Sequence, residues 1–401
     1  MTVGTPYHQP FHDPASQGGA VDPWGRGMQQ PVQQPQQAIA PLPVPVRRGR
    51  SAPIWVFGVL IFLLLGIIGY FLTFLGAAAS IVGLFAALIP LAIVICGALV
   101  IDRWEPEPWS LRLLALGWGG VVAVGMALIA SLATSFVFGA LPGYEAMMSI
   151  VQAPIVEEVG KGLGLLVIFL IARRTFDGPI DGVVYGALIG AGFAFVENIQ
   201  YFAVSIIDGG AVQLGMTFVL RGLLSPFAHA MFTAVTGALM GIAARRHGTA
   251  GAVFVSGLLG LAGAIALHMF WNWSATFGSF FALYFTLQVP LFVGFIVTIV
   301  LLRREEERAT LKNFAVYSAA GWFTPEEVAM LATPTGRRAG MQWAAHLRGD
   351  RRPLMRTFIR DATALASVRQ RIVNGSDRLA PADEQALLIR MTATRAQLLA
   401  P

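Results

Sequence analysis

The sequence GVVYGALIGAGFAFVENIQYFAVSI, residues 182–206, decides the fold class of this protein. As a helix it exceeds the ~20 residues needed to cross ~30 Å of hydrocarbon. Glu197 is the one charged side chain in this run. A charge inside a bilayer is costly, so a carboxylate in such a segment indicates a functional site. The segment therefore predicts both a membrane span and a residue with a chemical role.

Eight hydrophobic segments lie between residues 53 and 302. Hydrophobic residues make up 56% of the 401-residue chain and charged residues 12%, about half of the share that is usual in soluble proteins. The sequence therefore predicts an all-α, polytopic membrane bundle of about eight transmembrane helices. The approximate limits of the segments are 54–75, 80–101, 112–138, 149–172, 182–206, 222–244, 250–273 and 281–302.

Arginine residues are distributed unevenly among the loops between these segments. If the N-terminus is inside, the outer side receives Arg221 alone. Positive charge is retained on the cytoplasmic side of membrane proteins. We therefore expect a multi-pass protein of the cell membrane with both termini in the cytoplasm. The arginines on the inner side are Arg47, Arg48, Arg50, Arg103, Arg112, Arg173, Arg174, Arg245, Arg246, Arg303 and Arg304.

The chain divides into three parts. Residues 1–52 are rich in Pro and Gln, so we expect a disordered tail that cannot bury a core. Residues 53–302 form the membrane domain. Residues 303–401 carry the whole formal net charge of +6 and read as a helical tail, in which Thr324-Pro325-Glu326-Glu327 starts one helix. Beside a membrane domain, this basic tail indicates attraction to the lipid bilayer rather than to nucleic acid.

Six ionisable residues lie within the predicted spans, on four consecutive segments. At 1.5 Å per residue, these segments alternate in direction and bring the six groups to one level near the outer side of the membrane. Single residues have structural explanations, such as an ion pair between Glu158 and Lys161 or a packing role for either histidine. Polar residues placed for packing alone would not share one level. The six are Glu157, Glu158, Lys161, Glu197, His229 and His268.

Two imidazoles and a carboxylate are sufficient protein ligands for a hydrolytic zinc ion. His229, His268 and Glu197 could supply such a set, which makes Zn²⁺ the expected cofactor. The chain has no His-Glu-x-x-His sequence, so the common metalloprotease helix is absent. In a metal-free alternative, Glu157 and Glu158 activate water directly and the histidines act as hydrogen-bond donors.

The remaining polar residues suit the other steps of peptide hydrolysis. Glu157 or Glu158 could take a proton from the attacking water and return it to the leaving amine. Lys161 lies three and four residues beyond these acids, so it can neutralise part of their charge across one helical turn. Asn272, one turn beyond His268, could donate a hydrogen bond to the oxyanion.

Four motifs on consecutive spans resemble those of one known family. They are Glu157-Glu158-Val159-Gly160-Lys161, Phe193-Ala194-Phe195-Val196-Glu197-Asn198, the isolated His229, and His268-Met269-Phe270-Trp271-Asn272. Together, over residues 150–275, they resemble the PrsW family of intramembrane proteases, which belongs with CAAX-prenyl endopeptidases and Abi-type membrane proteins.

The resemblance implies a metal-dependent peptidase that cuts a membrane-anchored protein on its extracytoplasmic side. In this family the first cut of an anti-sigma factor is the best-known activity. We therefore expect a membrane-embedded protease that acts on membrane-anchored protein substrates. Two other classes remain as alternatives: an ion- or proton-coupled transporter, and a non-catalytic membrane binding protein. A transporter would favour an internal repeat, and a non-catalytic relative would favour a lost motif residue; neither is evident in the sequence.

Overall fold

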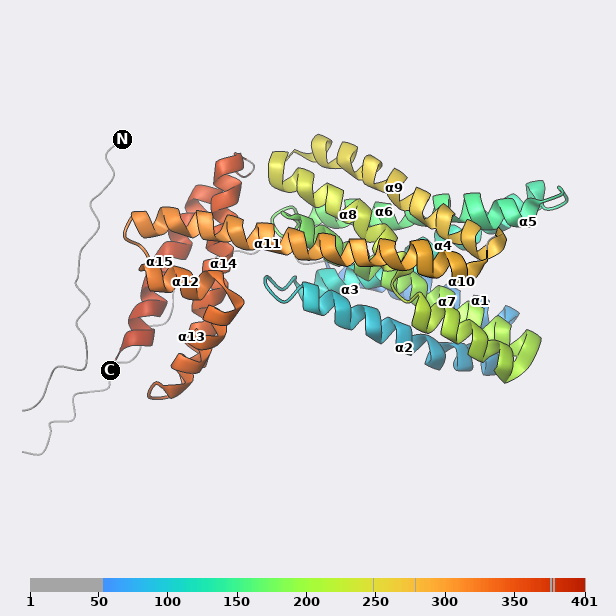
Figure 1. Ribbon diagram of the computed structural model, residues 1–401, viewed down its shortest axis with the longest axis horizontal. Coiled ribbons are helices and arrows are strands. Elements are labelled where there is room, and N and C mark those ends of the chain that lie inside the picture. The colour runs from blue at the N-terminus through green and yellow to red at the C-terminus, as the bar shows by residue number, and fades with distance from the viewer. Residues whose placement is uncertain (1–52, 248, 278, 376, 378, 401) are drawn as a thin grey trace, which may run out of the picture.

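The computed structural model describes residues 53–400 except 248, 278, 376 and 378. Within these residues every regular element is a helix, so the predicted all-α class is confirmed. Figure 1 shows a bundle of long helices and, at one end of it, a smaller group of C-terminal helices. The tail 1–52, for which we predict disorder, lies outside the described residues.

The membrane region consists of long α-helices interrupted by short π-helical segments. Each of the eight predicted hydrophobic segments falls on these helices. In chain order they are α1 (Ile54–Phe74), α2 (Ala77–Ile101), α3 (Trp109–Gly117), η2 (Trp118–Ala123), α4 (Val124–Phe138), α5 (Tyr144–Met147), η3 (Met148–Gln152), α6 (Ala153–Ile171), α7 (Pro179–Thr217), η4 (Phe218–Leu224), α8 (Ala228–His247), α9 (Ala250–Phe277), α10 (Phe280–Leu283), η5 (Tyr284–Gln288) and α11 (Val289–Ala319).

Six continuous helical stretches of the described chain are long and apolar enough to cross a membrane. One of these stretches, Pro179–Arg246, contains both α7 and α8. Helix α6 carries three charged side chains and is not among the six. The chain therefore has the architecture of a polytopic membrane protein, and the number of eight crossings stays a prediction.

Helix α7 forms the centre of the bundle. Its residues from Pro179 to Ala194 are all buried, whereas α1, α2 and α9 bury only a minority of their residues. Large apolar side chains on the outside of a bundle are compatible with contact with the lipid bilayer. The helix breaks at Gly209 and Gly210, where Gly210 has a φ of 63°, and the chain then returns towards α8 through η4.

Glycines bring α7 and α8 into direct backbone contact. A Cβ atom on Gly190 would lie 2.4 Å from the carbonyl oxygen of His229, and one on Gly182 would lie 1.9 Å from that of Gly237. Small residues at such positions let membrane helices approach closely. The contact at Gly190 holds the first turn of α8, and with it His229, against the centre of the bundle.

Helix α11 continues from the membrane region into the C-terminal helices without a break. The predicted boundary at residue 302 falls inside it. The helices that follow are α12 (Pro325–Ala332), α13 (Pro334–His346), α14 (Arg352–Asn374) and α15 (Ala380–Leu399). They share a core with Phe314 of α11. The predicted start at Thr324 is a capping box, because its hydroxyl accepts from the backbone N–H of Glu327 at 3.2 Å.

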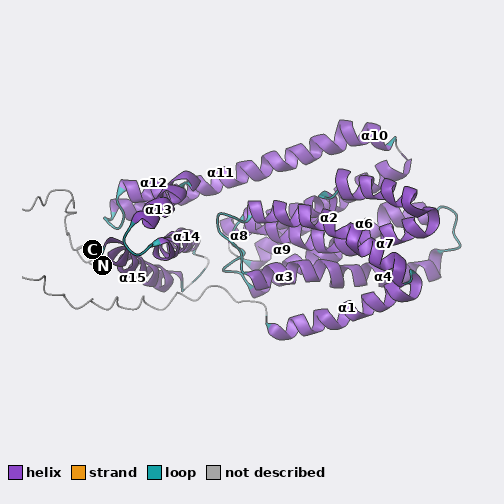
Figure 2. Cartoon of the chain, turned by 90° about the horizontal axis from the view of Figure 1, so that it is seen from below, coloured by secondary structure: helices purple, strands orange, loops and turns teal. Residues whose placement is uncertain are grey.

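The C-terminal helices dock onto loops at one end of the bundle. Arg371 Nη1 lies 2.9 Å from Asp177 Oδ2, and the Arg337 guanidinium lies 3.6 Å from the ring centroid of Trp104. Figure 2 shows these helices beyond the end of the bundle, connected to it by α11. The loops 102–108 and 172–178, which we expect in the cytoplasm, therefore lie at the same end as the C-terminal helices.

Candidate active site

Helix α6 supplies two carboxylates and an ammonium group to the interior of the bundle. Lys161 is 0% exposed, and its Nζ lies 2.8 Å from Glu158 Oε1 and 3.3 Å from Glu157 Oε2. Residues three and four apart share one face of a helix, so one lysine can contact both acids. The helix packs closely against η2, where Trp118 Nε1 donates to the carbonyl oxygen of Gly160 at 2.9 Å.

His229 on α8 is held between groups from two other helices. Its Nε2 lies 2.9 Å from Glu197 Oε2, and its Nδ1 lies 3.1 Å from Lys161 Nζ. An ammonium group only donates, so Nδ1 must carry the lone pair and Nε2–H donates to Glu197. This lone pair faces Glu157, whose Oε2 is 4.0 Å from Nδ1.

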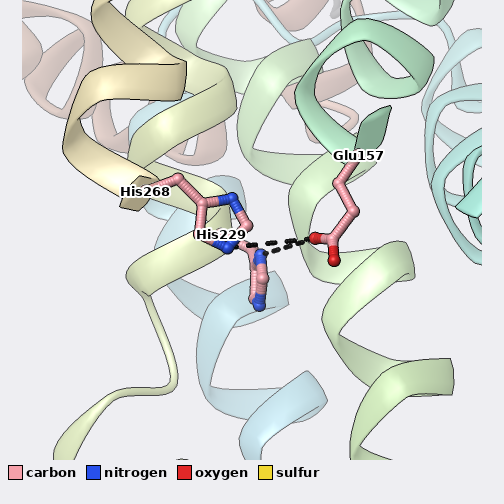
Figure 3. Close-up of side chains that lie close together, drawn as sticks. All are labelled: Glu157, His229 and His268. Carbon is pink, nitrogen blue, oxygen red and sulfur yellow. Dashed lines mark ion pairs between the residues drawn. The ribbon is translucent and has the colours of Figure 1, made fainter. Parts of the chain in front are cut away.

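His268 on α9 is oriented in the same way by a different carboxylate. Its Nδ1 lies 3.1 Å from Glu158 Oε1, so Nδ1–H donates to that carboxylate. The other oxygen of Glu158 accepts from the hydroxyl of Thr233 at 3.0 Å. The free nitrogen of His268, Nε2, lies 3.9 Å from Glu157 Oε2. Figure 3 shows both imidazoles directed towards the Glu157 carboxylate.

Glu157, His229 and His268 form a buried group with the donor atoms that a metal ion needs. One ligand atom from each residue lies within 4.8 Å of the others. Two imidazole nitrogens and one carboxylate oxygen are a set that catalytic zinc uses. Metal-binding histidines usually donate their other N–H to a carboxylate, and both histidines do so here. The residues therefore fit a divalent metal.

Glu197, which we predict as the third metal ligand, occupies a different place from Glu157. It forms an ion pair with Arg221 of η4 in addition to its contact with His229. Arg221 also donates from Nε to Asn198 Oδ1 at 3.0 Å and lies 3.8 Å above the ring centroid of Tyr201. An arginine that the sequence places at a span boundary is therefore a part of the site.

Three other residues complete the description of the site. Asn272 lies one turn beyond His268, and its amide donates to the backbone oxygen of Ser149 at 2.8 Å, so its proposed oxyanion role stays a prediction. Sequence reasoning missed Thr233, although it follows His229 by four residues and so shares its helix face. It also missed the contact of Lys161 Nζ with the Phe193 ring, 3.8 Å from the centroid.

A cavity of about 350 Å³ leads to this cluster from between α4, α6 and α7. Glu157 and Glu197 both line it. Its other walls are largely apolar, and a few neutral polar side chains stand among them. The principal wall residues are Val124, Ala127, Leu128, Gln152, Gln200 and Tyr201.

The fold and this cluster define a class: a polytopic helical membrane protein with a buried site of carboxylates, imidazoles and one lysine. Residues 107–299 match the family model described as PrsW family intramembrane metalloprotease. This membrane region is therefore similar to the PrsW family, and the resemblance predicted from the four motifs is confirmed.

Two curated relatives match the same part of the chain. Protease PrsW of Geobacillus kaustophilus (strain HTA426) is 30% identical over 140 residues, which are 35% of this chain and 57% of that protein. Protease PrsW of Clostridioides difficile (strain 630) is 31% identical over 138 residues, 34% of this chain and 55% of that protein. The chain thus spans little more than half the length of these relatives. No solved structure matches it.

Proposed function

We propose that this protein is an intramembrane metalloprotease that hydrolyses peptide bonds of membrane-anchored proteins. The observation that carries the proposal is the convergence of two carboxylate–imidazole pairs on Glu157. His229 is paired with Glu197 and His268 with Glu158, and the other ring nitrogens of the two histidines lie 4.0 Å and 3.9 Å from the same oxygen of Glu157. Carboxylates that orient the second nitrogen of each imidazole are typical of catalytic metal sites, which supports the proposal.

Glu157, His229 Nδ1 and His268 Nε2 are the ligands that we propose for a divalent ion, with Zn²⁺ as the proposed metal. Such an ion supplies a Lewis acid and makes bound water acidic enough to act as a nucleophile near neutral pH. We favour Glu157 over Glu197 as the third ligand because one ligand atom each of Glu157, His229 and His268 lies within 4.8 Å of the others. Lys161 contacts Glu157 and His229 as well, so it competes with the metal for the same two atoms.

Side chains of the protein carry out the remaining steps. Glu158 and Glu197 accept the imidazole N–H groups and fix which ring nitrogen is free. Lys161 and Arg221 keep three carboxylates from repelling one another inside the bundle. If Glu157 binds the metal, Glu197 is the other carboxylate that the described residues place in the cavity wall. We therefore propose that Glu197 takes the proton of the attacking water and returns it to the leaving amine.

The cavity between α4 and α7 is the proposed path of the substrate. Its apolar walls suit a segment that arrives from the lipid, and the amides of Gln152 and Gln200 can bind the peptide backbone of that segment. The cluster lies near the start of α8 and ~27 Å along α9 from Ala250 at 1.5 Å per residue, far from the end where the C-terminal helices dock. If the protein lies in the cell membrane with both termini in the cytoplasm, cleavage falls near the extracytoplasmic face. Anti-sigma-factor-like regulators are the substrate class that the resemblance implies.

Comparative membrane proteomics tests this function. Cells that contain the wild-type protein are compared with cells that contain Glu157→Gln or Glu145→Gln, where Glu145 is an exposed glutamate of α5 and serves as the matched control. We expect fragments cut beside a membrane span in the wild type and in Glu145→Gln, and their loss in Glu157→Gln at equal protein amounts. Identical fragments in all three strains would contradict the proposal.

A further inference from the structure

A second cavity, of about 530 Å³, lies where the C-terminal helices meet the membrane region. Loop residues 103–108 form one wall. The other wall comes largely from one face of α14, which presents Arg356, Arg360, Thr363 and Ser367 at intervals of three and four residues. Apolar side chains of the same helix, among them Ile359 and Val368, also line the cavity, so the polar groups stand among apolar ones.

All four carboxylates in the walls of this cavity have hydrogen-bond or ion-pair partners. Asp177 pairs with Arg371 at 2.9 Å, and Asp383 pairs with Arg174 at 3.5 Å. Glu107 accepts from the hydroxyl of Tyr185 at 2.7 Å. The fourth, Glu105, accepts from Ser367 Oγ at 3.2 Å.

Four arginines of the walls lack a comparable counter-charge. Among the described residues, neither Arg103 nor Arg356 has a carboxylate within salt-bridge distance. Arg360 Nε is 3.9 Å from Asp361, which Arg390 holds at 2.8 Å. Arg337 rests on the ring of Trp104 and donates to the backbone oxygen of Leu331 and to Thr363, which are all uncharged. The cavity therefore has an excess of positive charge.

Arg103, Arg356 and Arg360 are exposed, whereas Arg337 is partly buried. Burial lowers the pKa of its guanidinium to about 10, and the charges of Glu105 and Glu307 offset this effect only in part. The group still carries its charge at neutral pH. A desolvated cation is stabilised when an anion comes within reach.

We propose that this cavity binds a phosphate group, carried by an anionic phospholipid or by a small soluble phosphate compound. Guanidinium groups match phosphate oxygens in geometry and charge. The cavity adjoins the end of α2 at Ile101 and the start of α3 at Trp109, which is the level of lipid head groups in a membrane. A bound phosphate would link α14 to the loop 103–108 and so hold the C-terminal helices against the membrane region.

The test uses the full-length protein, purified and delipidated in a neutral detergent. Thermal unfolding is followed by tryptophan fluorescence during titration with dioctanoyl phosphatidylglycerol, glycerol 3-phosphate or dioctanoylglycerol, which has no phosphate. A ligand of the native state raises the melting temperature, and the rise grows with the logarithm of the ligand concentration once this exceeds the dissociation constant. We expect such a rise with phosphatidylglycerol, and an affinity at least tenfold lower in the variant Arg356→Gln/Arg360→Gln.

The variant Arg338→Gln/Arg348→Gln is the matched control, because both residues are exposed arginines of the same helical group outside the cavity walls. It should bind like the wild type. If glycerol 3-phosphate raises the melting temperature as much as phosphatidylglycerol does, the ligand is a soluble phosphate compound. If only phosphatidylglycerol raises it, the ligand is the lipid. No shift with either, a shift with dioctanoylglycerol of the same size, or an equal loss in the control variant would overturn the proposal.

Discussion

The buried cluster of α6–α9 and the junction with the C-terminal helices both consist of ion pairs, yet their environments differ. In the cluster, the side chains of Lys161 and Glu158 are 0% exposed. At the junction, Arg174 is 30% and Asp377 15% exposed, although their contact of 3.0 Å is nearly as short. Water can replace a partner at the junction but not in the cluster. Ion pairs of nearly equal length therefore differ greatly in how much the protein is destabilised when one partner is removed.

This contrast also separates the proposed catalytic site from the proposed phosphate-binding cavity. Buried charges are retained in a membrane only where each has its partners, which fixes the position of every group. The imidazoles of His229 and His268 gain a defined orientation from this constraint. The junction has a looser constraint and an excess of arginine, which suits the binding of a soluble or lipid anion.

Lys161→Met is expected to have the largest effect on stability. It leaves Glu157 and Glu158 without their shared cation, and breaking a buried ion pair costs about 3–5 kcal/mol. Protein in the membrane should fall several-fold, and added Zn²⁺ should restore part of it, because the metal would occupy the same atoms. Quantitative blotting of membranes measures this. Lys312→Met, at an exposed lysine of α11, is the control and should change nothing; an equal loss there would refute the interpretation.

Gly190→Ala tests how closely the buried cluster depends on the packing of α7 against α8. The new Cβ would lie 2.4 Å from the carbonyl oxygen of His229, so α8 must shift away from α7. Overpacking of this kind costs about 1–3 kcal/mol, and displacement of His229 should lower proteolysis much more than stability. Gly251→Ala is the control, since its Cβ would meet nothing within 4 Å. Activity and melting temperature measured together decide: unchanged activity in Gly190→Ala would count against the role of this contact.

Arg174→Gln is expected to have the smallest effect. Its pairs with Asp377 and Asp383 are partly exposed, and exposed pairs contribute about 0–1 kcal/mol. Thermal unfolding should shift by no more than a few degrees, and the shift should shrink further at high salt, which screens exposed charges. A loss as large as that of Lys161→Met would show that the two regions do not differ in the way we describe.

The sequence was sufficient to predict the fold class and most members of the cluster, because charges are rare inside apolar spans. Glu157, Lys161 and His268 stand out for that reason alone. The roles of these residues are harder to predict from the sequence. Which nitrogen of each histidine faces Glu157 depends on side-chain rotamers and on partners from other helices, and no spacing along one helix contains that information.

Other features depend on contacts between distant parts of the chain. Arg221 reads as a boundary residue in the sequence, and only the return of the chain after Gly210 brings it to Glu197. The Thr233 contact with Glu158 is of the same kind, since it joins two helices. The arginine-rich cavity requires α14 to meet the loop 103–108, a pairing that neither segment encodes by itself.

Metal content tests the central claim most directly. The purified wild-type protein, His229→Ala/His268→Ala and the control His346→Ala, at an exposed histidine of α13, are dialysed against trace Zn²⁺ and measured by elemental analysis. The account predicts about one ion per chain in the wild type and in His346→Ala, and a stoichiometry near zero in the double variant. Wild-type protein that cuts its substrate without bound metal, or a double variant that retains a full equivalent, would contradict it.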